Sequence, residues 1–202
     1  MIGIAGNIGV GKTSMTEKLS KDFSCPAIFE SVIDNPYLSD FYKDMNRWSF
    51  NLQIYFLYTR FESQIKLMDK NSSFIQDRTI YEDKEIFAKN LYNLGYMTKR
   101  DYSSYCSLFN SMLKFIEEPD LIIYLKANTD TLMSRIKHRN RDYELEMSSE
   151  YIHSLNIYYD KWINSIEKEK VLIIDTNNFN LFKDKDKYDS IVIDIKNKIN
   201  EI

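Results

Sequence analysis

The segment Gly6–Thr13, which reads Gly-Asn-Ile-Gly-Val-Gly-Lys-Thr, constrains this chain of 202 residues more than any other. It matches the pattern G-x-x-x-x-G-K-[S/T], in which a loop between a strand and a helix surrounds phosphate groups with backbone N–H groups. Four of the five glycines of the chain lie within residues 1–11, and glycine is needed where the backbone takes a positive φ or approaches a ligand closely. The apolar run Ile2–Ala5 precedes the loop and a segment of helical period follows it. This region is expected to fold as strand, loop and helix, and a chance glycine turn is the weaker interpretation.

The pattern also assigns roles within the loop. Lys12 is expected to reach the β- and γ-phosphates of a nucleotide, and the hydroxyl of Thr13 to ligate Mg²⁺. The residues expected to contact the nucleotide are Gly6, Asn7, Ile8, Gly9, Val10, Gly11, Lys12, Thr13 and Ser14.

Short apolar runs alternate with longer segments of helical period along the rest of the chain. The runs are continuously apolar, which is typical of parallel strands covered on both faces. Strands are expected at Ile2–Ala5, Ala27–Glu30, Ser73–Asp77, Leu121–Leu125 and Val171–Asp175. Helices are expected at Lys12–Asp22, Tyr37–Lys43, Phe50–Met68, Tyr81–Leu91, Lys99–Ile116, Asp130–His138, Ser149–Lys168 and Tyr188–Ile199. This order predicts an α/β fold with three layers and a five-stranded parallel sheet. The Lys/Asp-rich stretch from about Phe182 to Tyr188 predicts a solvated loop.

Composition limits the class of protein. Apolar residues make up 44% of the chain and charged residues 28%, with a net charge of −3, so a single globular domain over residues 1–202 is expected. The acidic balance argues against binding to a nucleic-acid polymer or a membrane surface. Cys25 and Cys106 form no CxxC pattern, which excludes a zinc knuckle and predicts reduced thiols in the cytoplasm.

GTPases share the phosphate loop but need two further motifs, D-x-x-G and [N/T]-K-x-D. No glycine of the chain has an aspartate three residues before it. Thr98–Asp101 matches the second motif but does not follow an apolar strand. We interpret Thr98–Asp101 as the start of a helix and reject the GTPase reading.

Charged residues end two of the other expected strands. Glu30 ends the second strand, and Asp77 with Arg78 ends the third. Ligands of open parallel sheets lie at the carboxyl ends of the strands, so these side chains are expected to converge near the phosphate loop. Simple solvation of strand ends is the alternative for each residue alone.

Three arginines occur late in the chain. Arg135 and Arg139 share a helix face by their spacing, and Arg141 follows just beyond. They form either a solvated basic face or a set of guanidinium groups that closes over a transferring phosphoryl group.

Together these motifs resemble the deoxyribonucleoside kinase family, in particular its bacterial deoxyadenosine/deoxyguanosine kinase group, which is related to deoxycytidine kinase. The resemblance runs from about Ile2 to Asp175 and rests on Gly6–Thr13, Phe29–Val32, Asn35–Leu38, Arg47–Phe50, Gln53 with Arg60, Asp77–Thr79, Asp83 and Arg135–Arg141. It implies a P-loop kinase that transfers the γ-phosphoryl group of ATP, with Mg²⁺, to the 5′-hydroxyl of a deoxyribonucleoside in nucleotide salvage. It also implies a homodimer that packs helices, with Phe50–Met68 and Tyr102–Phe115 as candidates.

The resemblance implies catalytic roles at the sheet edge. Glu30 matches the general base that takes the proton of the 5′-hydroxyl, and Arg78 matches the arginine that holds this glutamate and the 5′-oxygen. Asp77 matches the acidic residue that helps Thr13 to hold Mg²⁺.

The resemblance also implies how the nucleoside is bound. Tyr42 and Glu144 match the pair that binds the 3′-hydroxyl. Gln53, Arg60 and Asp83 match the trio that contacts the base, with Arg60 and Asp83 facing each other across the end of the pocket. Deoxyadenosine is expected to be favoured, deoxyguanosine or deoxycytidine possible and thymidine poor.

On the donor side, the resemblance implies a lid at about residues 135–146. Arg135, Arg139 and Arg141 match its arginines, of which Arg139 and Arg141 join Lys12 among the catalytic residues. Asn177 and Phe179 lie in the expected loop at the adenine of ATP.

Two other functions stay open at this point. A nucleoside monophosphate kinase, such as a thymidylate kinase, shares the phosphate loop, the Asp-Arg pair and the arginine lid, but needs basic residues where this chain has Glu30. A non-catalytic nucleotide-sensing module is the second alternative, against which the presence of Lys12 and Glu30 argues.

Overall fold

The computed structural model of the chain describes residues 1–29, 35–68, 73–144 and 147–201. In these residues five parallel strands form one sheet in the order β2-β3-β1-β4-β5. The strands are β1 (Ile2–Gly6), β2 (Ala27–Ile28), β3 (Ile75–Asp77), β4 (Leu121–Lys126) and β5 (Val171–Asp175). The expected α/β fold with a five-stranded parallel sheet is confirmed.

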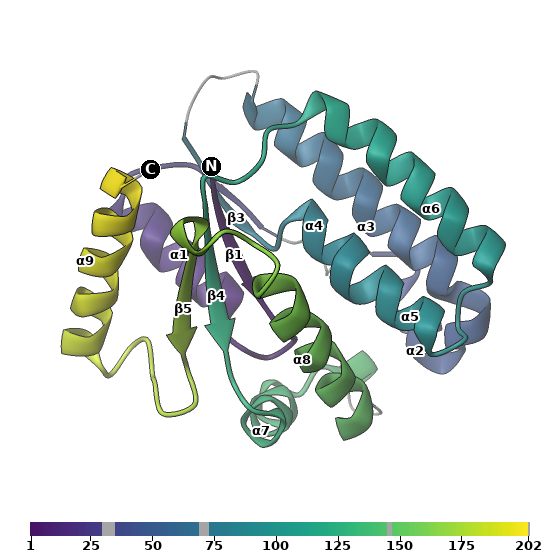
Figure 1. Cartoon of the computed structure of the whole chain (residues 1–202). Helices are drawn as coiled ribbons and strands as arrows, with labels where there is room; N and C mark the ends of the chain where they lie inside the picture. The colour runs from purple at the N-terminus through teal and green to yellow at the C-terminus, as the bar shows by residue number, and fades with distance from the viewer. Residues whose placement is uncertain (30–34, 69–72, 145–146, 202) are drawn as a thin grey trace.

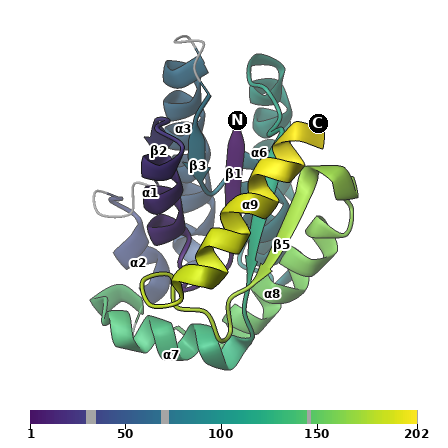
Figure 2. The same ribbon diagram turned by 90° about the vertical axis from the view of Figure 1, so that its left-hand side faces the viewer.

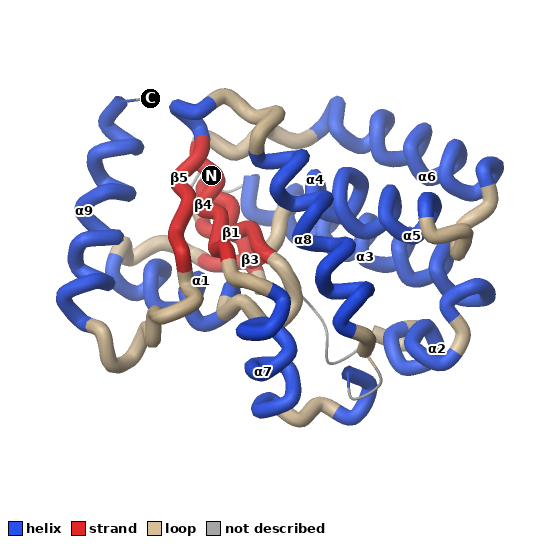
Figure 3. Tube along the Cα trace, turned by 60° about the horizontal axis from the view of Figure 1, so that its bottom comes forward, coloured by secondary structure: helices blue, strands red, loops and turns tan. Residues whose placement is uncertain are grey.

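Helices cover both faces of the sheet (Figures 1 and 3). One face carries α1 (Lys12–Asp22) and α9 (Lys185–Glu201). The other face carries a thicker helical layer formed by α3 (Met45–Met68), α4 (Ile80–Glu82), α5 (Lys89–Asn93), α6 (Lys99–Met112) and α8 (Ser149–Ile163). At the carboxyl ends of the strands lie α2 (Leu38–Lys43) and α7 (Thr129–Arg139), and Figure 2 shows α7 below the sheet.

Four short segments complete the described structure. They are a π-helix, η1 (Asp83–Ala88), and three 3₁₀-helices, η2 (Leu113–Phe115), η3 (Asp142–Glu144) and η4 (Lys168–Lys170). Among the described residues no helix is both long enough and apolar enough to cross a lipid bilayer.

The central strand β1 places the phosphate loop at the middle of the sheet. It pairs with β3 and β4, so that Ile4 lies beside Asp77 on one side and Ile123 on the other. Ile4 and Ile123 are fully buried, as expected for a strand with neighbours on both sides and helices on both faces. The loop that follows β1 therefore opens where β3 also ends, which is the usual ligand site of such sheets.

Several expected boundaries are wrong. The helix expected at Tyr81–Leu91 is interrupted by η1, and α8 ends at Ile163 rather than at Lys168. The expected loop from Phe182 to Tyr188 is too long, because α9 already begins at Lys185. The Tyr188 side chain is buried and its hydroxyl donates a hydrogen bond to Asp22 of α1. This packing explains why a Lys/Asp-rich stretch becomes helical.

Candidate active site

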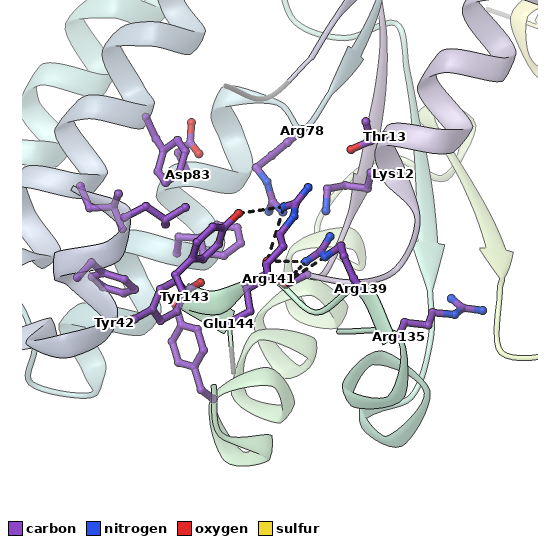
Figure 4. A pocket seen from close by; sticks show the side chains of 18 of the residues that line it. Lys12, Thr13, Tyr42, Arg78, Asp83, Arg135, Arg139, Arg141, Tyr143 and Glu144 are labelled. Atoms are coloured by element: carbon purple, nitrogen blue, oxygen red, sulfur yellow. Dashed lines mark hydrogen bonds and ion pairs between the residues drawn. The ribbon is translucent and has the colours of Figure 1, made fainter. Parts of the chain in front are cut away.

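A cavity of about 560 Å³ opens at the carboxyl ends of the strands, between the phosphate loop, α2, α3 and the lid segment (Figure 4). Fourteen of the residues proposed from the sequence line it: Ile8, Gly9, Gly11, Lys12, Thr13, Ser14, Tyr42, Gln53, Arg78, Asp83, Arg135, Arg139, Arg141 and Glu144. Seven other described candidates do not line it: Gly6, Asn7, Val10, Arg60, Asp77, Asn177 and Phe179. Glu30, the expected general base, lies outside the described residues.

The phosphate loop is fixed from two directions. Gly9 has a φ of 82°, and a Cβ atom there would lie 2.8 Å from Cγ1 of Ile136, because α7 packs directly on the loop. Asn7 donates hydrogen bonds from Nδ2 to the carbonyl of Ile152 and to Oδ1 of Asn156, both on α8. Nζ of Lys12 donates to the carbonyl of Asn7 at 3.0 Å. The loop is thus already shaped by its own side chains and by α7 and α8.

Thr13 and Asp77 meet next to the loop. Oγ1 of Thr13 donates to Oδ2 of Asp77 at 2.6 Å, and Asp77 is 1% exposed at the end of β3. A hydroxyl and a carboxylate are the oxygen donors that Mg²⁺ prefers. Among the described residues no group of three His, Cys, Asp or Glu side chains could hold a metal. A cation bound here would need phosphate and water oxygens to complete its shell, which is how Mg²⁺ usually binds in nucleotide sites.

Arg78 follows Asp77 and takes a φ of 68°. This turn places its guanidinium at the cavity wall, where it stacks over the ring of Phe87 at 4.4 Å. Nη1 donates to the hydroxyl of Tyr159 at 2.6 Å and lies 3.6 Å from Oε1 of Glu82.

Glu82 was missed by the sequence reasoning. It is fully buried and accepts hydrogen bonds from the backbone N–H of Gly6 (3.3 Å), the backbone N–H of Thr79 (2.7 Å) and the hydroxyl of Tyr159 (2.8 Å). A signal was present, because Thr79-Ile-Tyr-Glu82 fits the T-x-x-E capping box and the structure forms that box at the start of α4. Tyr159 carried no such signal, since it is one of 15 tyrosines.

Arg60 and Asp83 form a buried ion pair. Nε of Arg60 lies 2.7 Å from Oδ2 of Asp83 and Nη2 lies 3.2 Å from Oδ1. Nη1 of Arg60 also donates to the carbonyls of Asp77 and Arg78. As expected, Arg60 and Asp83 face each other, and they do so in direct contact; Asp83 lines the cavity, whereas Arg60 does not.

Gln53 on α3 lines the same end of the cavity and is 2% exposed. Its Oε1 is buried and has no hydrogen-bond partner among the described residues. A buried amide oxygen without a partner is costly, so Gln53 is prepared to accept a hydrogen bond from a ligand.

The lid segment holds Glu144. Arg139 contacts this carboxylate with two nitrogens, Nε at 3.1 Å and Nη2 at 2.5 Å. Nη1 of Arg141 lies 3.7 Å from Oε1 of Glu144 and donates to the hydroxyl of Tyr143. The ring of Tyr143 stacks on Tyr42 of α2, with centroids 6.1 Å apart. Tyr42 and Glu144 therefore line one cavity, and Arg139 and Arg141 hold the Glu144 carboxylate.

Arg135 points away from the other two arginines (Figure 4). Its guanidinium donates to the carbonyl of Val10, to Oγ1 and the carbonyl of Thr176, and to the carbonyl of Phe179. Although Arg135 and Arg139 are expected to share a helix face, their guanidinium groups do not meet. Arg135 instead connects the phosphate loop with the segment after β5.

Asn177 and Phe179 lie in that segment without lining the cavity. Oδ1 of Asn177 accepts the backbone N–H of Asn128, and Nδ2 donates to Asp175. Phe179 is buried beneath Nζ of Lys187.

The sequence model of one family, described as deoxynucleoside kinase, matches residues 2–200. The chain belongs to the deoxynucleoside kinase family. Deoxyadenosine/deoxycytidine kinase of Bacillus subtilis (strain 168) is 38% identical over 203 residues, which cover 100% of this chain and 94% of that protein. Deoxyadenosine kinase of Dictyostelium discoideum is 44% identical over 167 residues, covering 83% of this chain and 68% of that protein.

Solved structures agree with this family. Deoxyadenosine kinase from M. mycoides with bound dATP superposes with a TM-score of 0.83 at 31% identity, covering 96% of this chain and 98% of that one. The expected activity, phosphorylation of nucleoside 5′-hydroxyls in salvage by a nucleotide donor, is confirmed at the level of the family. Neither a nucleoside monophosphate kinase nor a sensing module is favoured.

Proposed function

We propose that this kinase transfers the γ-phosphoryl group of ATP to deoxyadenosine in preference to the other deoxynucleosides, with deoxyguanosine or deoxycytidine as secondary acceptors. The observation that carries the proposal is the single cavity that joins Lys12 of the phosphate loop to Gln53 and Asp83 at its far end. The relatives named for deoxyadenosine support adenine as the favoured base.

On the donor side, Lys12, Arg139 and Arg141 bind the phosphates and neutralise the charge that spreads over the transferring group. Thr13 and Asp77 are the residues that would hold Mg²⁺. When bound, Mg²⁺ supplies charge stabilisation at the phosphate oxygens. For this role Arg139 must exchange the Glu144 carboxylate for a phosphate of the donor.

The adenine of ATP binds next to Arg135. This arginine donates hydrogen bonds to the carbonyls of Val10, Thr176 and Phe179. It therefore connects the phosphate loop with the segment that contains Asn177 and Phe179. These two residues act through their backbone and their packing, since their side chains are engaged elsewhere.

On the acceptor side, Gln53 and Asp83 contact the base, and Arg60 fixes Asp83 from behind. The unpartnered Oε1 of Gln53 suits the exocyclic amino group of adenine, and Nε2 can donate to a ring nitrogen. Tyr42 and Glu144 bind the 3′-hydroxyl.

Two residues act at the 5′-hydroxyl. Glu30 takes its proton as general base, and Arg78 keeps that carboxylate ionised and contacts the 5′-oxygen.

The proposal is tested by ADP formation from ATP and Mg²⁺ with a panel of acceptors. The panel contains the four deoxynucleosides, their ribose counterparts and their monophosphates. The expected order of kcat/KM places deoxyadenosine first and thymidine last, with little activity on ribonucleosides or monophosphates. A monophosphate as the best acceptor would contradict the proposal.

We also propose that the enzyme is a cytoplasmic homodimer. Tyr58 on α3, Leu108 on α6 and Phe115 on η2 are large side chains between 39% and 67% exposed, and α3 packs on α6, so a second copy that packs on these helices would cover exposed apolar side chains. Cys25 and Cys106 are free thiols, as suits a reducing compartment. Light scattering is expected to give twice the mass of the chain, and the mass of a single chain would contradict the dimer.

A further inference from the structure

A buried chain of hydrogen bonds runs from Arg78 at the cavity wall into the helical layer, through two residues that do not line the cavity. Arg78 donates to the Tyr159 hydroxyl at 2.6 Å, and this hydroxyl donates to Oε1 of Glu82 at 2.8 Å. Glu82 in turn accepts the backbone N–H of Gly6, at the entrance of the phosphate loop. Tyr159 does not line the cavity and is fully buried on α8.

The direction of these bonds is fixed by chemistry. A guanidinium can only donate and a carboxylate can only accept, so the single proton of Tyr159 must point to Glu82 and its lone pair to Arg78. Burial raises the pKa of the Tyr159 hydroxyl well above its usual range, so it stays protonated at any working pH. Phenylalanine at this position would keep the ring and remove both hydrogen bonds.

The ring and the hydroxyl of Tyr159 make separate contacts. The ring itself is held by apolar contacts: it stacks on Tyr124 of β4 with centroids 5.6 Å apart and meets Trp162 edge-on. Its hydroxyl, by contrast, lies between the guanidinium of Arg78 and the carboxylate of Glu82, two residues that follow β3 in the chain. It therefore connects the acceptor side of the site, at Arg78, with the donor side, at Gly6.

We propose that Tyr159 is a positioning residue for phosphoryl transfer, which orients the Arg78 guanidinium and keeps it in register with the phosphate loop through Glu82. The inference rests on the proposed role of Arg78 at the 5′-oxygen. A hydrogen bond to a charged group is worth the equivalent of about 10- to 100-fold in a rate, and this sets the scale of the loss expected when the alignment of Arg78 is removed.

The test compares Tyr159→Phe with Tyr124→Phe. Tyr124 is the matched control, because it is a buried tyrosine stacked on the same ring, and its hydroxyl lies 3.4 Å from Asp160, which does not line the cavity. Tyr159→Phe is expected to lower kcat at least ~10-fold with both KM values within about threefold of wild type. Tyr124→Phe is expected to leave kcat and KM unchanged. Equal kcat in Tyr159→Phe and wild type, or equal losses in both variants, would overturn the proposal.

A double-mutant cycle shows whether Tyr159 acts through Arg78. In an Arg78→Met background, Tyr159→Phe is expected to change kcat by less than about twofold, because the group it positions is gone. A full, additive loss in that background would overturn the proposal. If Tyr159→Phe does not fold, Glu82→Gln replaces it: the amide keeps the shape of the carboxylate but loses its charge, and unchanged kcat would count against the proposal.

The wild-type enzyme separates this inference from the proposed function. Absence of ADP formation with every deoxynucleoside would refute the function itself. Normal wild-type turnover with an unaffected Tyr159→Phe variant would refute only the role of Tyr159.

Discussion

Arg78 takes a backbone conformation that residues other than glycine rarely adopt. The left-handed region costs about 1–2 kcal/mol for a residue with a Cβ atom. Here the N–H of Arg78 donates to the carbonyl of Ile4 at 3.0 Å, and its own carbonyl accepts from Arg60 at 2.9 Å. These bonds from β1 and α3 hold the strained turn, and the turn directs the guanidinium to the cavity. Local strain of this kind is common at active sites.

Lys12→Ala is expected to lower kcat/KM by about 10²- to 10³-fold, the loss typical for removal of one preorganised charge donor. The factor is expected to be the same for deoxyadenosine and deoxycytidine, because Lys12 belongs to the phosphate loop and its proposed role is at the donor phosphates alone. Steady-state kinetics with both acceptors measure it. Lys21→Ala, at an exposed position of the same helix, is the control and is expected to match wild type. A loss confined to one acceptor would contradict the donor role.

Glu30→Gln is expected to lose most of kcat, because the amide keeps the shape of the side chain but cannot take the proton of the 5′-hydroxyl. General-base catalysis is typically worth about 10²- to 10⁴-fold. Deoxynucleoside affinity, measured by equilibrium binding, is expected to stay within a few-fold of wild type. A variant with nearly normal kcat would refute Glu30 as the base.

Sequence analysis finds the site residues that belong to a motif of neighbouring positions in the chain. Lys12 and Thr13 were predictable because the loop, its preceding strand and its following helix are adjacent in the chain, and Glu82 could have been found from its capping box with Thr79. Tyr159 could not be found, because its contact with Arg78 joins residues that lie 81 positions apart in the chain.

At the scale of elements, η1 is the least regular segment around the cavity. It begins at Asp83, whose carboxylate is held by Arg60 of α3. A π-helix inserts an extra residue into a helical turn and is often found at functional sites. The periodicity of Tyr81–Leu91 predicts a plain helix, because a contact with another element, such as that of Asp83 with Arg60, leaves no trace in local spacing. The early start of α9 likewise accompanies a tertiary contact, the hydrogen bond from Tyr188 to Asp22 of α1.

The Arg60–Asp83 pair supports a prediction about stability and base choice. Asp83→Ala deprives a buried Arg60 of its bidentate partner and is expected to cost about 3–5 kcal/mol in the free energy of unfolding. Arg60→Met with Asp83→Ala removes both charges and is expected to cost less than Asp83→Ala alone. Urea denaturation measures both. Glu85→Ala, also in η1 but at a half-exposed side chain, is the control with a small change.

The same double variant is expected to change acceptor preference. Wild-type kcat/KM for thymidine is expected to be at least ~10-fold below that for deoxyadenosine. A difference of this size results when the base loses a hydrogen-bonding partner or when the 5-methyl group of thymine clashes with the pocket. Removing the Asp83 carboxylate from the cavity wall is expected to narrow or reverse this gap. Equal use of thymidine and deoxyadenosine by the wild type would refute the placement of the base at Asp83.

At the scale of the whole molecule, the cavity is lined by elements that lie far apart in the sequence. Its walls come from α1, α2, α3, η1 and the lid segment after α7. A ligand that contacts all of them binds the folded chain alone and therefore stabilises it.

Ligand binding is therefore expected to raise Tm. At about 100 times Kd, one ligand adds about 2.7 kcal/mol, which corresponds to roughly 5–10 °C for a chain of this size. Differential scanning fluorimetry with ATP and with deoxyadenosine measures the shifts. Lys12→Ala is expected to reduce the shift with ATP and to leave the shift with deoxyadenosine unchanged. A reduced shift with both ligands would contradict the separation of donor and acceptor sides.

The central position of β1 has a consequence for synthesis on the ribosome. Ile2 pairs with Ile75 of β3 and with Leu121 of β4, so the second neighbour of the strand is made about 120 residues later. At about 5–20 residues per second, β1 and the glycine-rich loop behind it wait on the order of ten seconds before both flanks can form. During that interval an apolar strand is exposed without its sheet. Chaperones that bind extended apolar segments have their longest opportunity at Ile2–Gly6.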